Sequence, residues 1–224
     1  MQYWRRIAPV IGLAMAAALI NSAVASAAAT SPKDTAILQA GVITATDVPL
    51  TWTGHKQPDA GTTQFNGIAA CKQMRAATLA ANKTTPRAQS QTFADTSTST
   101  GLPQATSVVY VFKNTAAAKA YLATDKTAAA ANCLQQVFQK AYGHATVTSI
   151  TNQLQGVGDD NAGFEAAITG TLNGQPVTIT ADNIVVRAGR TFVGFVFYAE
   201  GSQAVSQGPA IVNAVVNRLK AVPQ

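Results

Sequence analysis

The segment FEAAITGTLNGQPVTITADNIVVR, residues 164–187, decides the fold of this chain. Its central Asn173-Gly174 pair separates two runs rich in β-branched residues, Phe164 to Leu172 and Val177 to Arg187. Asn-Gly is the strongest short-range signal for a tight β-hairpin, because both residues tolerate the left-handed conformation that the turn requires. The segment therefore predicts two long antiparallel strands joined by a tight turn.

Further strands are predicted on both sides of this hairpin. After a tight turn at residues 187–190, Thr191 to Tyr198 forms a near-continuous apolar run. Ser107 to Lys113 is rich in β-branched and aromatic residues, which is typical of a strand. Shorter strands are predicted at Arg87 to Thr96 and at Thr146 to Leu154.

Helices are predicted around these strands. Ser31-Pro32 begins a short helix that ends at Gly41, since Ser is a good N-cap and Pro is favoured in the first turn. A second helix is predicted over residues 66–81, one long helix from Thr115 to about Tyr142, and a terminal helix from about Pro209. This order predicts an α+β fold, with helices packed on one face of an antiparallel β-sheet.

The first 27 residues have the layout of a secretory signal peptide. Arg5 and Arg6 form a positive n-region, Ile7 to Ile20 is uncharged and Ala-rich, and cleavage is predicted after Ala27. A permanent membrane anchor would need about 20 strongly apolar residues, and this run is shorter. The sequence therefore predicts a secreted, extracellular protein with residues 28–224 as a single domain.

Composition and charge limit the classes of function. Apolar residues make up 47% of the chain and charged residues 12%, which is typical of a globular domain rather than of disorder. The formal charge of +6 loses two with Arg5 and Arg6, leaving about +4, and the remaining basic residues form no run. Nucleic-acid-binding proteins concentrate basic residues in a patch. Neither nucleic-acid binding nor membrane contact after cleavage is predicted, and the chain is expected to be a monomer without a cofactor.

Cys71 and Cys133 are the only cysteines in the chain. In an oxidising compartment an isolated pair most simply forms one disulfide. A redox-active pair would favour close spacing such as Cys-x-x-Cys, which is absent. A structural disulfide between the helix near residue 71 and the long helix is therefore predicted.

No catalytic or metal-binding residues are predicted. His55 and His144 are the only histidines and lie in separate, turn-like segments, whereas a zinc site needs about three or four close ligands. Asp159 and Asp160 are adjacent in a polar turn, where their side chains diverge. The chain has no Gly-x-Ser-x-Gly and no His-Glu-x-x-His motif. A Ser-His-Asp site assembled in space stays open, because such triads are recognised by geometry.

Four short motifs carry a resemblance to a known family. They are ATDVPLTW at residues 45–52, SVVYVF at residues 107–112 followed by the helix with Cys133, VGDD at residues 157–160, and IVVRAG at residues 184–189. With these motifs, residues 35–222 resemble the PknH-like extracellular sensor domains of actinobacteria. The resemblance implies an antiparallel sheet whose helices form a groove for an envelope ligand.

The predicted function is therefore that of an exported, non-enzymatic, ligand-binding protein of the cell envelope. Its ligand would be a small molecule, a lipid or a cell-wall fragment, bound where the irregular segment at residues 47–52 meets the sheet. Trp52 would supply apolar contact, and Arg187 and Asp47 are the candidate polar anchors. Arg187 is the better candidate, because its planar guanidinium suits carboxylate and phosphate groups.

Each of these assignments has an alternative that the sequence leaves open. Trp52 also suits a core position, Asp47 a turn cap, and Arg187 the end of a strand in solvent. Two other functions also stay open. One is a secreted hydrolase with a spatially assembled site, and the other is a secreted inhibitor or interaction protein that uses residues 55–61.

Overall fold

The structure is a computed structural model that describes residues 30–56, 62, 65–150, 154, 156–172, 175–201 and 205–223. The signal peptide predicted for residues 1–27 lies outside the described residues, as do Asn173 and Gly174. In the described part of the chain, the helices are too short or too polar to cross a membrane.

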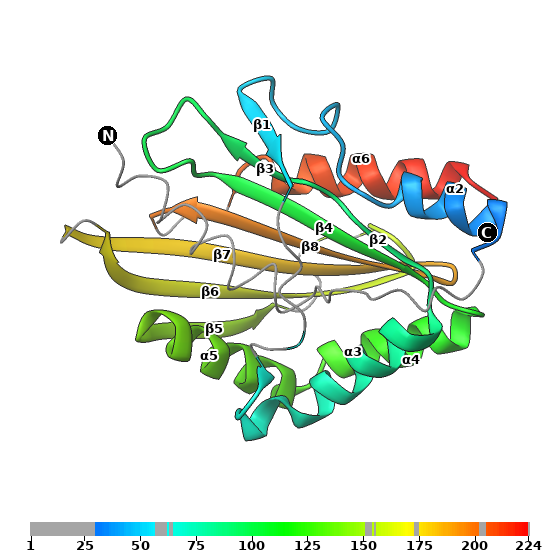
Figure 1. Cartoon of the computed structure of the whole chain (residues 1–224), viewed down its shortest axis with the longest axis horizontal. Helices are drawn as coiled ribbons and strands as arrows, with labels where there is room; N and C mark the ends of the chain where they lie inside the picture. The colour runs from blue at the N-terminus through cyan, green and yellow to red at the C-terminus, as the bar shows by residue number, and fades with distance from the viewer. Residues whose placement is uncertain are drawn as a thin grey trace.

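An eight-stranded antiparallel sheet forms the centre of the molecule (Figure 1). The predicted hairpin is confirmed as β6 (Asp160–Leu172) and β7 (Gln175–Ala188), which pair along their whole length. β8 (Thr191–Glu200) pairs with β7, and β4 (Gln104–Val111) pairs with β8. The remaining strands lie at the edges: β5 (His144–Ile150) beside β6, β3 (Thr92–Asp95) and β2 (Arg87–Gln89) beside β4, and β1 (Trp52–His55) beside β3.

Two details of the strands differ from the predictions. The single strand expected over residues 87–96 is divided into β2 and β3, which both pair with β4. The division falls at Ser90, whose hydroxyl accepts a hydrogen bond from the N–H of Ser107 at 2.9 Å and so replaces a backbone acceptor. No strand was predicted at residues 52–55, where the structure has edge strand β1.

The helices begin where capping residues stand. In α2 (Pro32–Ala40), the Ser31 hydroxyl accepts from the N–H of Asp34 at 3.0 Å, so the predicted N-cap is confirmed. The second helix is α3 (Lys72–Thr84), preceded by the short 3-10 turn η3 (Ala69–Cys71). The terminal helix is α6 (Gly208–Ala221).

The long helix predicted from Thr115 to Tyr142 is two helices, α4 (Thr115–Asp125) and α5 (Ala128–Tyr142). The helix breaks at Thr127, whose backbone is extended, with a φ of −94° and a ψ of 150°. Its hydroxyl accepts from the N–H of Ala130 at 3.1 Å and caps α5. The prediction of one long helix was therefore wrong, because the alanine-rich pattern continues across the boundary between α4 and α5.

Helices cover both faces of the sheet, where the sequence predicted one. Along β4, Val108 and Tyr110 pack against α3, α4 and α5, while Val109 and Val111 pack against α2 and α6. Every residue of β4 is buried, and so are the first eight of β8. Strands that are buried on both faces have continuous apolar runs, which explains the apolar runs within the sequences of β4 and β8. The α+β class and the antiparallel sheet are confirmed.

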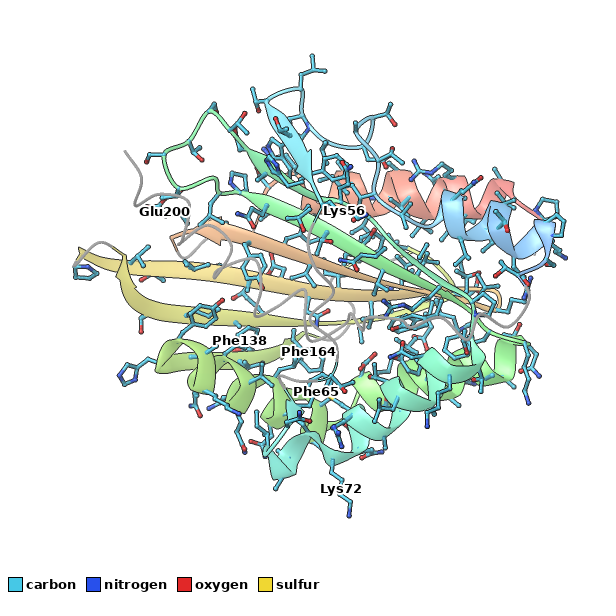
Figure 2. All side chains as sticks on the ribbon, in the orientation of Figure 1. Lys56, Phe65, Lys72, Phe138, Phe164 and Glu200 are labelled. Atoms are coloured by element: carbon cyan, nitrogen blue, oxygen red, sulfur yellow. A yellow bond between two sulfur atoms is a disulfide. The ribbon has the colours of Figure 1, made fainter. Side chains whose placement is uncertain are left out.

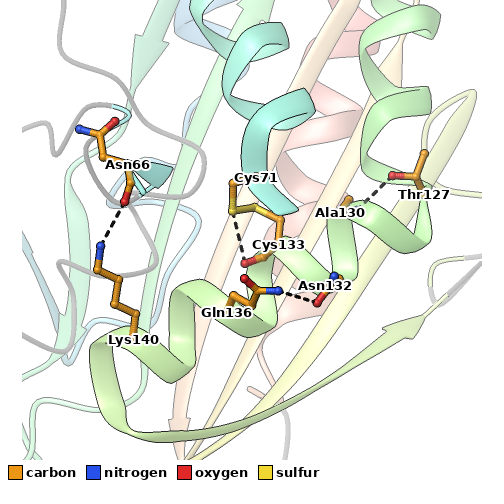
Figure 3. Close-up of a disulfide and its surroundings, with 8 residues drawn as sticks. All are labelled: Asn66, Cys71, Thr127, Ala130, Asn132, Cys133, Gln136 and Lys140. Atoms are coloured by element: carbon orange, nitrogen blue, oxygen red, sulfur yellow. Dashed lines mark hydrogen bonds between the residues drawn. A yellow bond between two sulfur atoms is a disulfide. The ribbon is translucent and has the colours of Figure 1, made fainter. Parts of the chain in front are cut away.

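The predicted disulfide between Cys71 and Cys133 is also confirmed (Figure 3). It joins η3, at the start of α3, to α5, and both cysteines are fully buried. Phe65, Phe138 and Phe164 belong to the same core cluster, between α5 and the sheet (Figure 2).

Candidate functional site

Two of the predicted site residues contact other parts of the protein: Trp52 packs in the core, and Asp47 pairs with Arg218. Trp52 is buried in the core cluster under α2 and α6. Asp47 accepts hydrogen bonds from the N–H of Thr44 at 2.8 Å and from both terminal nitrogens of Arg218, at 2.7 and 3.0 Å. Burial alone would raise the pKa of Asp47, but the hydrogen bonds from Arg218 and Thr44 outweigh it and hold the pKa below its ordinary value.

Arg187, the third predicted residue, holds two turns together. Its Nη1 donates to Asp159 Oδ2 at 2.9 Å, and the same oxygen accepts from the N–H of Gly189 at 2.7 Å. The N–H of Asp159 in turn donates to the Arg187 carbonyl at 2.7 Å. Gly158 has a φ of +68°, and a Cβ there would lie 2.6 Å from that carbonyl, so the turn requires glycine. Two of the four family-like motifs therefore contact each other.

The structure places Trp52 and Arg187 far apart. Trp52 pairs with Asp95 of β3. Followed across β4 and β8, the strand register places this pair near Ala181 of β7, at one end of the sheet. Arg187 lies six residues farther along β7. At about 3.3 Å per residue this is roughly 20 Å. A ligand-binding role for Trp52, Asp47 or Arg187 stays a prediction.

An apolar groove lies instead between α3 and α4, with a volume of about 480 Å³. Its lining includes Phe112 and Tyr121, whose ring centroids are 5.2 Å apart, and we call this aromatic pair the floor. Alanines of α3 and α4 form much of the rest of the lining, and we call them the walls; they have no side-chain atoms beyond Cβ. The lining residues are Ala77, Ala80, Ala81, Thr84, Thr85, Phe112, Lys113, Ala117, Ala120, Tyr121 and Thr124.

The floor of the groove is neutral. Burial raises the pKa of Tyr121 well above its ordinary value, and the nearby Tyr110 and Asp125 raise it further. The Tyr121 hydroxyl therefore keeps its proton at neutral pH. Lys113 is the cation among the lining residues. The groove therefore offers an apolar interior with one positive charge at its lining.

A buried carboxyl lies four residues after Tyr121 on α4. Asp125 is only 6% exposed, and its Oδ2 has no hydrogen-bond partner among the residues that the structure describes. Burial raises the pKa of Asp125 from 3.8 to about 7. This side chain therefore resists ionisation in the folded state.

We expect Asp125→Asn to remove part of the pH dependence of stability. The unfolded chain loses the Asp125 proton near pH 4 and the folded chain near pH 7, so wild-type stability falls as the pH rises between these values. We expect a fall of about 2 kcal/mol, below the limit of about 4 kcal/mol that the full pKa difference sets. Urea unfolding of both proteins from pH 4 to 8 measures it.

The comparison of the two proteins isolates Asp125 from other carboxyls. Burial, together with the nearby Glu165, raises the pKa of Asp182 to about 6, but this group is present in both proteins and its contribution cancels. Parallel pH profiles for the wild type and the variant would contradict the assignment.

The two histidines of the chain lie far apart. His55 lies on edge strand β1 and His144 on β5 at the opposite edge, and both are exposed. Glu165 and Asp182 are paired across β6 and β7, and Asp182 is buried. Within the described ranges, no group of three or more His, Cys, Asp or Glu side chains is arranged to hold a metal ion.

Comparisons with known proteins give a distant structural similarity. No family model and no curated protein matches the chain. Among solved structures, the chain is similar to the extracellular domain of PknH from Mycobacterium tuberculosis, with 12% sequence identity and a TM-score of 0.28. The match covers 53% of this chain and 56% of that one, so it spans little more than half of either.

Proposed function

We propose that this chain is an exported, non-enzymatic protein of the cell envelope that binds an apolar ligand between α3 and α4. The observation that carries the proposal is the solvent-open groove with alanine walls and an aromatic floor. Its volume of about 480 Å³ is within the range of roughly 300–1,000 Å³ typical of small-molecule sites. The disulfide supports export, because such bonds persist in oxidising compartments.

The lining favours one class of ligand. Alanine and aromatic surfaces contact alkyl chains well but offer few hydrogen bonds. Lys113 suits an acidic group at one end of the ligand, and the hydroxyls of Thr84 and Thr85 lie in the same lining. A ligand with an alkyl chain and an acidic head therefore matches the groove best.

Filling the groove should abolish this binding. We expect Ala80→Leu and Ala120→Leu each to weaken binding of a fluorescent long-chain fatty acid by tenfold or more, because the added side chains occupy the ligand's space. Tenfold corresponds to about 1.4 kcal/mol of binding free energy. A fluorescence titration of each variant measures the dissociation constant.

The matched controls are Ala76→Leu and Ala123→Leu, exposed positions on the same two helices that do not line the groove. Alanine and leucine have similar helix propensities, so all four variants should stay folded. Binding that is equally weak or equally strong in all four variants would place the ligand elsewhere. Failure of the wild type to bind any fatty acid would refute the proposed ligand class.

A further inference from the structure

The outer surface of α3, α4 and α5 is basic. Seven exposed cations lie on these helices or in the loops next to α4, and we call them the basic layer: Lys72, Arg75, Lys83, Lys113, Lys119, Lys126 and Lys140. Along the sequence they are spread over about 70 residues and form no run. In the fold, the three helices lie on the same face of the sheet, so their solvent-exposed sides point the same way (Figure 1).

Carboxylates do not balance this charge. Asp125 is the only acidic residue in the three helices, and it is buried. Lys126 forms an ion pair with Asp160 of β6, and Lys140 donates to the carbonyl of Asn66 at 3.1 Å. The other five cations form no ion pair with any residue that the structure describes. Lys72 extends away from the body of the molecule (Figure 2).

The sequence, in which the basic residues form no run, predicted no membrane contact. Because the fold gathers them on one face, we propose that the basic layer docks on an anionic lipid surface. Cations near such a surface each strengthen binding about fivefold, without a specific geometry. Six of the seven are lysines, whose flexible stems and compact charges suit a disordered array of headgroups better than a rigid bidentate partner. The surface between them is largely alanine, as at Ala76, Ala116 and Ala123, which adds no acidic groups.

Single-stranded nucleic acid is a poorer match, because its binding uses exposed aromatic side chains as stacking platforms. The aromatic side chains of α4 and α5, Tyr121, Phe138 and Tyr142, are all buried or partly buried. The groove between α3 and α4 opens in the same layer, so docking would bring it to the lipid. Docking itself depends on the charges and not on the groove.

Vesicle sedimentation tests the proposal. The mature protein should bind vesicles of phosphatidylcholine with about one third phosphatidylglycerol, and binding should weaken steeply as salt rises from about 0.1 to 0.5 M. It should not bind phosphatidylcholine alone. Absence of binding to the anionic vesicles, or equal binding to both kinds, would overturn the proposal.

Two triple variants with the same net charge show whether vesicle binding depends on the basic layer or only on the net charge of the protein. The triple variant Lys72→Glu, Lys83→Glu and Lys119→Glu should bind the anionic vesicles at least about 100-fold more weakly, because each lost cation costs about fivefold and each added carboxylate repels the surface. The control triple reverses exposed lysines outside the layer, Lys33, Lys56 and Lys220, and should bind within a few-fold of the wild type. Equal losses in both triples would show that only net charge matters and would overturn the proposal.

Two further measurements test whether the partner is a lipid surface and whether the charges, and not the groove, bind it. Soluble polyphosphate that binds as tightly as the vesicles at equal phosphate concentration would overturn the choice of a lipid surface. The groove variants Ala80→Leu and Ala120→Leu should keep vesicle binding, so failure of the proposed ligand and failure of docking are distinguishable. Loss of vesicle binding in these variants would show that the groove, and not the charge, holds the lipid.

Discussion

Replacing Cys71 and Cys133 with serine should lower the free energy of unfolding by about 4 kcal/mol. The bond closes a loop with a sequence separation of 62, so it restricts the unfolded chain strongly. In the folded state it joins η3 to α5 inside the core. Urea unfolding of the wild type and the double variant measures the difference.

Two comparisons separate the cross-link from the new hydroxyls, since both sites are fully buried. The double alanine variant lacks the hydroxyls, and the reduced wild type lacks only the bond. All three should lose comparable stability if the cross-link dominates. Two titratable thiols in the native secreted protein would contradict the disulfide itself.

Arg218→Met should lower the free energy of unfolding by about 3 kcal/mol, because it leaves a buried carboxylate without its cation. The Asp47 side chain is only 4% exposed. Arg218 also donates to the carbonyls of Ala40 and Val42, at 3.0 and 2.7 Å, where the chain leaves α2. One side chain thus joins α6 to the segment after α2. Thermal and urea unfolding measure the loss.

Lys220→Met on the same helix is the matched control, since Lys220 is exposed, and it should change stability by no more than about 0.5 kcal/mol. The pH dependence of the stability deficit shows whether it comes from the Asp47–Arg218 ion pair. Because the pKa of Asp47 is lowered in the folded state, its contribution is present above about pH 4 and is lost as the pH falls through the folded pKa. The deficit of Arg218→Met should therefore shrink in acid, and a constant deficit would contradict the ion-pair account.

Local patterns in the sequence predicted the elements that depend on neighbours along the chain. Asn173-Gly174 between two β-branched runs predicted the β6–β7 hairpin, and Ser31-Pro32 predicted the start of α2. The cysteine count predicted the disulfide. These signals act over a few residues, or require only that a pair exists. The alanine-rich run from residue 115 to 142 did not reveal its break, because alanine favours helix on both sides of Thr127.

Sequence by itself thus determined most of the strands, most helices and the disulfide, because turn chemistry, capping and periodicity are local. Only the tertiary structure decided what surrounds each side chain. It paired Asp47 with Arg218, 171 residues away, and placed Arg187 against Asp159. It also set the alanines of α3 opposite those of α4 to form the groove, and it gathered scattered lysines into the basic layer. These features depend on distances between segments remote in the chain, which a single sequence does not record.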